Sequence, residues 1–163
     1  MEYLKAVEKD INECILLKQD VFKRLKENNL PFWSEEYPSD ELIKEDVLSG
    51  GERIIKENNQ IIASTVLSKV KDERGESEYP FKTPNLYCFS RLMVKTGYEN
   101  KHVGYFLVSN VIEEIKNMGE IGIGIMVDPR NINALHLYSN FGFKLIETKE
   151  YEYGVFSTYE LLF

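Results

Sequence analysis

The sequence predicts an α+β fold in which a mixed central sheet of about seven strands is flanked by about four helices. Segments whose apolar residues alternate, as in strands, are interspersed with segments whose apolar residues recur every three or four positions, as in helices. The 163 residues are the usual size of one domain, and no repeat or low-complexity tract divides them. We therefore expect residues 1–163 to form a single domain.

The N-terminal part predicts one strand and two helices. Residues 3–7 have the pattern of a short strand. Apolar residues at helical spacing over 9–28, with a break, indicate a helix that Pro31 stops. Ser39 is a suitable N-cap for a second helix, which the glycine pair at 50–51 ends.

A hairpin and a further strand follow. Strands at 53–57 and 60–69 flank an Asn-Asn pair, which is typical of a two-residue hairpin turn. The polar stretch 71–84 contains glycine and two prolines, so we expect a surface loop there. Residues 86–94 then return to a strand pattern.

The C-terminal part alternates helices and strands. Residues 104–118 form an amphipathic pattern that Gly119 ends, and strict alternation over 121–127 indicates a strand. The strands before and after helix 104–118 should be parallel neighbours joined by a right-handed crossover. Gly122 and Gly124 in the second of these strands allow another group to approach closely. The remaining elements are a short helix at 132–140 and strands at 143–151 and 155–161, which meet near Gly154.

Composition excludes several classes of function. The formal net charge is −7 and no basic stripe is visible, which argues against nucleic acid as a partner. No apolar stretch approaches the roughly 20 residues that span a bilayer, and the N-terminus lacks a signal peptide, so we expect no membrane association and a cytoplasmic protein. Cys14 and Cys88 fit reduced core thiols, and no Cys/His cluster has zinc spacing, so no metal is expected.

The first segment with a chemical signature leads from a strand through a loop into a helix, RLMVKTGYENKHVGYFLVSNVIEE at 91–114. The first N–H groups of a helix have no intrahelical partner and, with the helix dipole, bind anions. Gly104 would let a phosphate approach the backbone. The residues at this turn are Asn100, Lys101, His102, Val103, Gly104 and Tyr105. By itself the loop fits an ordinary connection as well as a phosphate site, and the dinucleotide fingerprint G-x-G-x-x-G is absent.

The second segment is DPRNINALHLYSNFGF, residues 128–143. Asn131 can cap or start a helix, and Tyr138 follows seven residues later, so both can point toward one end of the sheet. Taken alone, a capped helix with a core tyrosine explains this pattern as well as a binding site does.

Together the two segments resemble the GCN5-related N-acetyltransferases (GNAT) over nearly the whole chain. The second segment is similar to the family's N-x-x-A-x-x-L-Y-x-x-x-G-F signature, matched at Asn131, Ala134, Leu137, Tyr138, Gly142 and Phe143. The loop resembles the family's Q/R-x-x-G-x-G/A pattern, with Gly104 kept and Glu99 and His102 as departures. The segment RLMV is similar to the family's fourth strand. The stretch FWSEEYPSDELIKEDVLSG resembles members that act on small molecules.

The resemblance implies a GNAT-like fold and an acyl-CoA-dependent N-acetyltransferase, which moves an acetyl group from acetyl-CoA to a primary amine of a small molecule. The alternatives are a peptide or protein N-acetyltransferase and a non-catalytic acyl-CoA-binding module. Acetyl-CoA is the implied co-substrate, and a homodimer remains open.

The resemblance also implies roles for particular residues. The pantetheine arm of CoA would add to the strand edge at Leu92, Met93 and Val94, and its pyrophosphate would lie on residues 100–105. Glu99 would point away from the pyrophosphate. Asn131 would bond the arm, and Tyr138 would lie near the sulfur and donate a proton to the leaving thiolate.

The acceptor pocket is less defined. Candidate contacts are Trp33, Glu36, Tyr37, Ser90 and Asp128. For three of them another role is open, namely core packing for Trp33, simple packing for Ser90 and a helix N-cap for Asp128. Some relatives place a glutamate general base where this chain has Met126, so the base is left unassigned.

Overall fold

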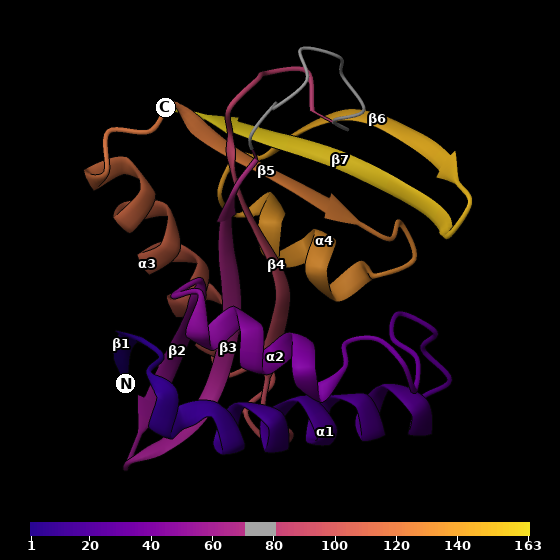
Figure 1. The fold of residues 1–163 in the computed structure, drawn as a ribbon. Coiled ribbons are helices and arrows are strands. Elements are labelled where there is room, and N and C mark those ends of the chain that lie inside the picture. Colours follow the sequence, from indigo (N-terminus) through magenta and orange to yellow (C-terminus); the bar gives the residue numbers. More distant parts are fainter. Residues whose placement is uncertain (71–80) are drawn as a thin grey trace. The chain divides into compact units, whose positions relative to one another are not determined.

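The computed structural model describes residues 1–70 and 81–163 (Figure 1). Within these residues the sheet order is β1-β2-β3-β4-β5-β7-β6. Its strands are β1 (Glu2–Lys5), β2 (Glu52–Glu57), β3 (Gln60–Lys69), β4 (Tyr87–Val94), β5 (Gly122–Val127), β6 (Lys144–Tyr151) and β7 (Gly154–Leu162). The helices are the 3-10 turn η1 (Glu8–Asp10), α1 (Ile11–Glu27), α2 (Asp40–Leu48), α3 (Val103–Asn117) and α4 (Ile132–Ser139). This seven-stranded mixed sheet with four α-helices confirms the predicted α+β fold.

The chain forms two compact units. Unit 1 comprises Met1–Leu67 and Arg91–Asn110, and unit 2 comprises Ser68–Ser90 and Val111–Phe163. Strand β4 and helix α3 therefore contribute residues to both. Of the predicted loop 71–84, residues 71–80 lie outside the described part of the chain.

Unit 1 begins with three antiparallel strands. Tyr3 of β1 pairs with Ile55 of β2, and Ile54 of β2 pairs with Ser64 of β3. The turn between β2 and β3 has Asn58 at φ 50° and Asn59 at φ 61°, the left-handed pair that a two-residue hairpin turn requires. The predicted hairpin is thus confirmed with its turn chemistry.

Helices α1 and α2 bury one apolar face each in unit 1. Ser39 caps α2, since its hydroxyl oxygen accepts a hydrogen bond from the Leu42 amide at 3.1 Å, as its sequence position predicted. The core gathers residues of α1, α2 and the strands: Ala6, Cys14, Leu17, Val21, Ile43, Val47, Ile54, Ile61 and Met93. Burying each large aliphatic side chain contributes about 1.5–3 kcal/mol, so this cluster holds α1 and α2 in place.

Unit 2 contains the parallel step of the sheet. Tyr87 and Cys88 of β4 pair in parallel with Ile123 and Gly124 of β5, as predicted for the strands on either side of α3. Strand β5 pairs antiparallel with β7, and β7 with β6. A Cβ on Gly124 would lie 2.6 Å from the ring of Phe81, so this glycine does permit the close approach that the sequence indicated.

Both cysteines are free. Burial is the main cause that raises the pKa of each thiol to about 12, so neither is a thiolate at neutral pH. This agrees with the expected reduced thiols. None of the helices in the described residues is long and apolar enough to cross a membrane.

Candidate functional site

The loop between β4 and α3 holds three residues in the left-handed conformation that glycine favours, and two of them are not glycine. Gly97, Asn100 and His102 have φ values of 88°, 57° and 60°. His102 stands where the resemblance expects the first glycine, and it adopts the left-handed conformation that glycine favours. Asn and His tolerate this region better than most residues do. The departure at His102 therefore changes the side chain and keeps the path of the chain.

Helix α1 anchors this loop within unit 1. The Asp20 carboxylate accepts a hydrogen bond from the Thr96 amide at 2.7 Å, and Arg24 donates to the Thr96 hydroxyl at 3.1 Å. Glu99 pairs with Arg24 at 3.0 Å and accepts from the Gly97 amide at 2.5 Å. The carboxylate that could repel a phosphate is thus occupied by a cation and a backbone donor. The pair is partly exposed, so its contribution to stability is small.

The loop leads into a helix whose N-terminus is suited to an anion. The 15-residue α3 has no acidic residue in its first turn, so no carboxylate of that turn competes for the positive end of the helix dipole. Lys101 and His102 are both exposed here, and the Lys101 ammonium lies 5.3 Å from the centre of the Tyr98 ring. This end of α3 offers backbone donors, a helix dipole and a lysine to a phosphate group.

Strand β4 is irregular next to the loop. Arg91 has φ 50°, which interrupts the extended backbone in the middle of the strand. Met93 is buried in the core of unit 1, whereas Leu92 and Val94 are half-buried. The ladder between β4 and β5 consists of the pairs that Tyr87 and Cys88 make, so the backbone from Phe89 onward has no partner in that ladder.

Tyr138 lies in unit 2 with a buried ring, 8% exposed. Its ring centre is 5.6 Å from that of Phe89 and 5.9 Å from that of Phe143. Burial raises the pKa of the phenol, so the hydroxyl stays protonated at neutral pH. In the part of the chain that the structure describes, no hydrogen bond is made by this hydroxyl. Tyr138 therefore carries an unused proton donor on a fixed aromatic ring.

Asn131 and Asp128, two of the predicted site residues, have different roles at the start of α4. Asn131 caps the helix, because its side-chain oxygen accepts a hydrogen bond from the Ala134 amide at 3.2 Å. The suggestion that Asp128 is the N-cap is therefore wrong. Asp128 instead accepts from the Arg130 guanidinium at 2.6 and 3.0 Å and from its amide at 2.9 Å. The bonds to Arg130 lower the pKa of Asp128, so it is a weak base that is already engaged.

Trp33, Glu36 and Ser90 are placed differently from one another. Trp33 packs against the core of unit 1. The sequence left core packing and an acceptor contact open for this residue, and its position fits core packing. Glu36 and Ser90 are exposed. Met126 is also exposed, on β5 of unit 2. A thioether accepts no proton, so this strand position supplies no base.

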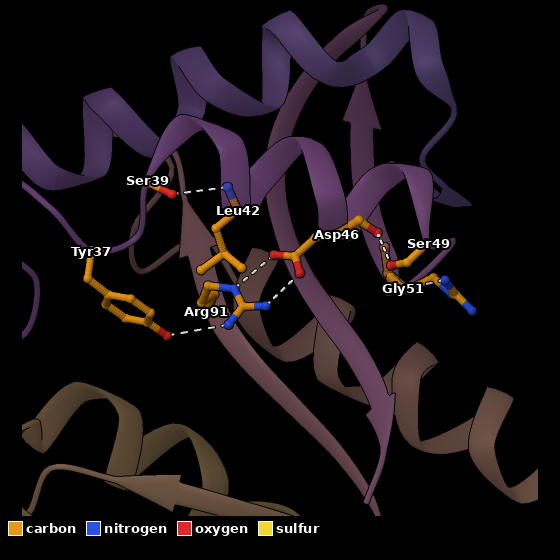
Figure 2. A network of polar contacts seen from close by, with 8 residues as sticks. Tyr37, Ser39, Leu42, Asp46, Ser49, Gly51 and Arg91 are labelled. Carbon is orange, nitrogen blue, oxygen red and sulfur yellow. Dashed lines mark hydrogen bonds and ion pairs between the residues drawn. The ribbon is translucent and has the colours of Figure 1, made fainter.

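Arg91, which the sequence did not single out, lies beside Tyr37, one of the candidate acceptor contacts in unit 1 (Figure 2). The Arg91 guanidinium donates from Nε and Nη2 to the two carboxylate oxygens of Asp46, at 2.9 and 2.7 Å. Its Nη1 faces the Tyr37 hydroxyl at 3.4 Å. Tyr37 lies in a turn, where its backbone amide donates a hydrogen bond to the Ser34 hydroxyl at 3.1 Å. Asp46 lies 45 residues before Arg91, so no local pattern could reveal the pair.

Glu52, at the start of β2, is a second buried acid that the sequence missed. Its side chain is 1% exposed, and burial raises its pKa to about 7, with the charge of Asp46 adding to the effect. Arg91 and Arg53 oppose the shift. The nearby Ser64 hydroxyl also opposes it. Among the described residues, the Ser64 hydroxyl oxygen and Glu52 Oε1 are both buried without a hydrogen-bond partner.

A hollow of about 480 Å³ in unit 2 contains none of the predicted site residues. It is lined by Lys82, Thr83, Lys144 and Glu160, among others. The Glu160 carboxylate is satisfied there by the Thr83 amide and hydroxyl, both at 2.8 Å. No unpaired polar group among these four points to a ligand, so we do not assign the acceptor to this hollow.

The sequence model of the Acetyltransferase (GNAT) family matches residues 19–143. The chain therefore belongs to the GNAT acetyltransferase family. The match spans the loop with its departures at Glu99 and His102 and the whole Asn131 to Phe143 signature.

Solved structures share the fold. A GNAT-family acetyltransferase from Streptococcus agalactiae is 15% identical, with a TM-score of 0.84 over 99% of this chain and 95% of that one. A ribosomal-protein-alanine N-acetyltransferase from Brucella melitensis is 16% identical, with a TM-score of 0.73 over 100% of both chains. The PaiA N-acetyltransferase from Thermoplasma acidophilum, solved with coenzyme A, is 18% identical, with a TM-score of 0.74 over 99% and 98%. No curated protein matches the sequence.

Proposed function

We propose that this protein transfers the acetyl group of acetyl-CoA to a primary amine of a small molecule. The observation that carries the proposal is the loop before α3. It keeps the left-handed backbone of a glycine-rich phosphate loop, it ends in a helix N-terminus free of acidic residues, and it has its one misplaced carboxylate neutralised by Arg24. A structural neighbour solved with coenzyme A supports this use of the fold.

Each part of the co-substrate has residues suited to it. The pyrophosphate would accept hydrogen bonds from the backbone of residues 100–105, with Lys101 as a nearby cation. The pantetheine amides would pair with the backbone of Leu92, Met93 and Val94, as an added strand does. Asn131 already uses its side-chain oxygen as a cap, so its remaining side-chain donors would be what it offers the arm.

Tyr138 would assist the departure of CoA. The amine nitrogen attacks the thioester carbonyl, the carbon–sulfur bond breaks, and the sulfur leaves as a thiolate that must be stabilised or protonated. The hydroxyl of Tyr138 is neutral and makes no hydrogen bond to a described residue, so it can donate to that sulfur. An ordinary thiol has a pKa of about 8.5, well below that of this phenol. Full proton transfer is therefore uphill, and a hydrogen bond to the thiolate is the larger part of the assistance.

No described carboxylate is an evident general base. Asp128 is occupied by Arg130, and Glu52 is buried. We propose that the amine loses its proton to water, so the free-base form of the acceptor is the reactant. Rates should then rise with pH until the acceptor amine is deprotonated.

The test is a screen of amines with acetyl-CoA that detects the released thiol, preceded by calorimetry with acetyl-CoA and with CoA. The proposal requires acetyl-CoA binding and amine-dependent thiol release. Binding without release for any amine or peptide would favour a non-catalytic acyl-CoA-binding module.

Peptides belong in the same screen. The ribosomal-protein-alanine N-acetyltransferase covers the whole chain with a TM-score of 0.73, which makes a protein N-terminus the second candidate acceptor. Thiol release with N-terminal peptides and not with small amines would select that alternative.

A further inference from the structure

The direction in which CoA would lie identifies the part of unit 1 that its reactive end would reach. The phosphate loop follows the C-terminal end of β4, so an arm that starts at the loop runs back along Val94, Met93 and Leu92. The next residue in that direction is Arg91, whose Cα is about 3.8 Å from that of Leu92. Arg91 is therefore the first charged residue beyond the end of the arm. This step rests on the proposed function.

Asp46 fixes the Arg91 guanidinium and leaves one of its edges without a carboxylate. A guanidinium has five N–H donors in a planar fork. Asp46 occupies the edge formed by Nε and Nη2, at 2.9 and 2.7 Å (Figure 2). The other edge joins Nη1 and Nη2. Its contact with a described residue is the Tyr37 hydroxyl at 3.4 Å, which is long for a hydrogen bond.

Burial strengthens a charge-assisted hydrogen bond made to this edge. The Arg91 side chain is 16% exposed and that of Asp46 is 10% exposed, so a charge placed beside them is poorly screened by water. Glu52, which interacts electrostatically with Arg91, has a pKa that burial raises to about 7, so at neutral pH it does not add a full negative charge. A carboxylate matches the fork of an arginine with two parallel hydrogen bonds.

We propose that Arg91 selects the acceptor, by binding a carboxylate that the acceptor carries a few bonds away from its amine. The acceptor class is thus an amino acid or a similar ω-amino carboxylate. Asp46 acts as a positioning residue that holds the guanidinium in place. Tyr37 closes the same edge and gives up its long contact, or shares it, when the carboxylate arrives.

The experiment compares each amino acid with its own carboxamide. Initial rates with acetyl-CoA are measured for glycine and glycinamide, and for β-alanine and β-alaninamide, and are expressed as acid-to-amide ratios of kcat/KM for the free-base amine. We expect the wild type to prefer the acids by roughly 10- to 100-fold, the usual range for hydrogen bonds to a charged group. Equal use of acids and amides would overturn the proposal while leaving the acetyltransferase function intact.

Arg91→Lys tests the residue. It keeps the charge beside Asp46 and loses the planar fork, so the acid-to-amide ratio should fall roughly 10-fold or more, through KM of the acids. The readout is this ratio, because a general loss of activity in the variant lowers the rates with acids and with amides alike. The matched control is Arg53→Lys, at another buried arginine of unit 1, which donates to the Gly50 and Gly51 carbonyls. A fall of the ratio in the control as large as in Arg91→Lys would overturn the assignment.

A binding measurement on the wild-type protein tests the proposed carboxylate site without turnover and without any variant. Calorimetry on the wild-type protein saturated with CoA compares N-acetyl-β-alanine with N-acetyl-β-alaninamide. Tighter binding of the acid by at least about 10-fold is expected, and equal binding would overturn the proposal. Failure of acetyl-CoA to bind would overturn the proposed function and this inference together. That result is distinct from tighter binding of the acid and from equal binding of acid and amide.

Discussion

At the residue scale, Glu52 shows how burial couples one side chain to stability. Burial raises the pKa of its carboxyl to about 7 in the folded protein, from the ordinary 4.5 of an exposed glutamate. Between these values the folded state holds the proton more tightly than the unfolded state. The free energy of unfolding therefore falls as pH rises through this window, and the loss is complete above about pH 7.

The first prediction concerns Glu52→Gln, which keeps the shape of the side chain and cannot ionise. At pH 8 the variant should be more stable than the wild type by up to about 3 kcal/mol, since one pKa unit corresponds to about 1.36 kcal/mol. At pH 4.5 the two should be similar. Urea denaturation at both values measures this difference. Glu35→Gln, at an exposed acid, is the matched control for the loss of one carboxylate. A difference that does not change with pH would show that the pKa of Glu52 is not raised in the folded protein.

The second prediction concerns Tyr138→Phe. The change removes the hydroxyl and keeps the ring that packs on Phe89 and Phe143, so the fold should hold. A hydrogen bond to a charged group contributes about 1.5–3 kcal/mol, which corresponds to roughly ten- to a hundredfold in rate. We expect kcat to fall roughly ten- to a hundredfold with acetyl-CoA affinity little changed. Wild-type kcat, with chemistry shown to be rate-limiting, would leave Tyr138 as a packing residue.

Which site residues could be predicted depends on how local their signal is. Asn131 and Tyr138 were found because both lie in one ungapped segment of the sequence. Asp46 and Arg91 were missed because their ion pair joins residues 45 positions apart, on α2 and on β4. The residues next to Arg91 in the sequence do not predict a positive φ there, because the surrounding fold sets this backbone conformation.

At the element scale, helices and strands were predicted from hydrophobic periodicity to within about two residues at most ends. The long α1 is preceded by the 3-10 turn η1, in agreement with the expected break. The first strand is the weakest match, since β1 covers Glu2–Lys5 where 3–7 was expected. Short strands at a sheet edge carry little pattern, and pairing with β2 decides their bounds.

The third prediction concerns the loop before α3. Gly104→Glu places a bulky anion at the proposed phosphate site and should abolish CoA binding by repulsion and lost approach. His102→Gly removes a non-glycine residue from φ 60° but makes the unfolded chain more flexible, so stability should change by less than about 1 kcal/mol. Its affinity for CoA should be equal to or tighter than that of the wild type. Calorimetry with CoA measures both variants. Normal binding by Gly104→Glu would place the pyrophosphate elsewhere.

At the scale of the whole molecule, the parallel step at α3 followed from the order of elements, because crossover connections permit few arrangements. The division into two units did not. It depends on tertiary contacts and splits β4 and α3, each of which reads as one continuous element in the sequence.

The last prediction follows for the protein as a whole. A ligand that binds only the folded state stabilises it by RT ln(1 + [L]/Kd), which is about 2.7 kcal/mol at a hundredfold excess over Kd. For a chain of this size, each kcal/mol raises the melting temperature by about 2–4 °C, so acetyl-CoA should raise it by roughly 5–10 °C. Thermal melts with increasing acetyl-CoA measure the shift, and Gly104→Glu should lose it. A melting temperature unchanged at millimolar acetyl-CoA would contradict the proposed CoA site and therefore the proposed acetyl transfer.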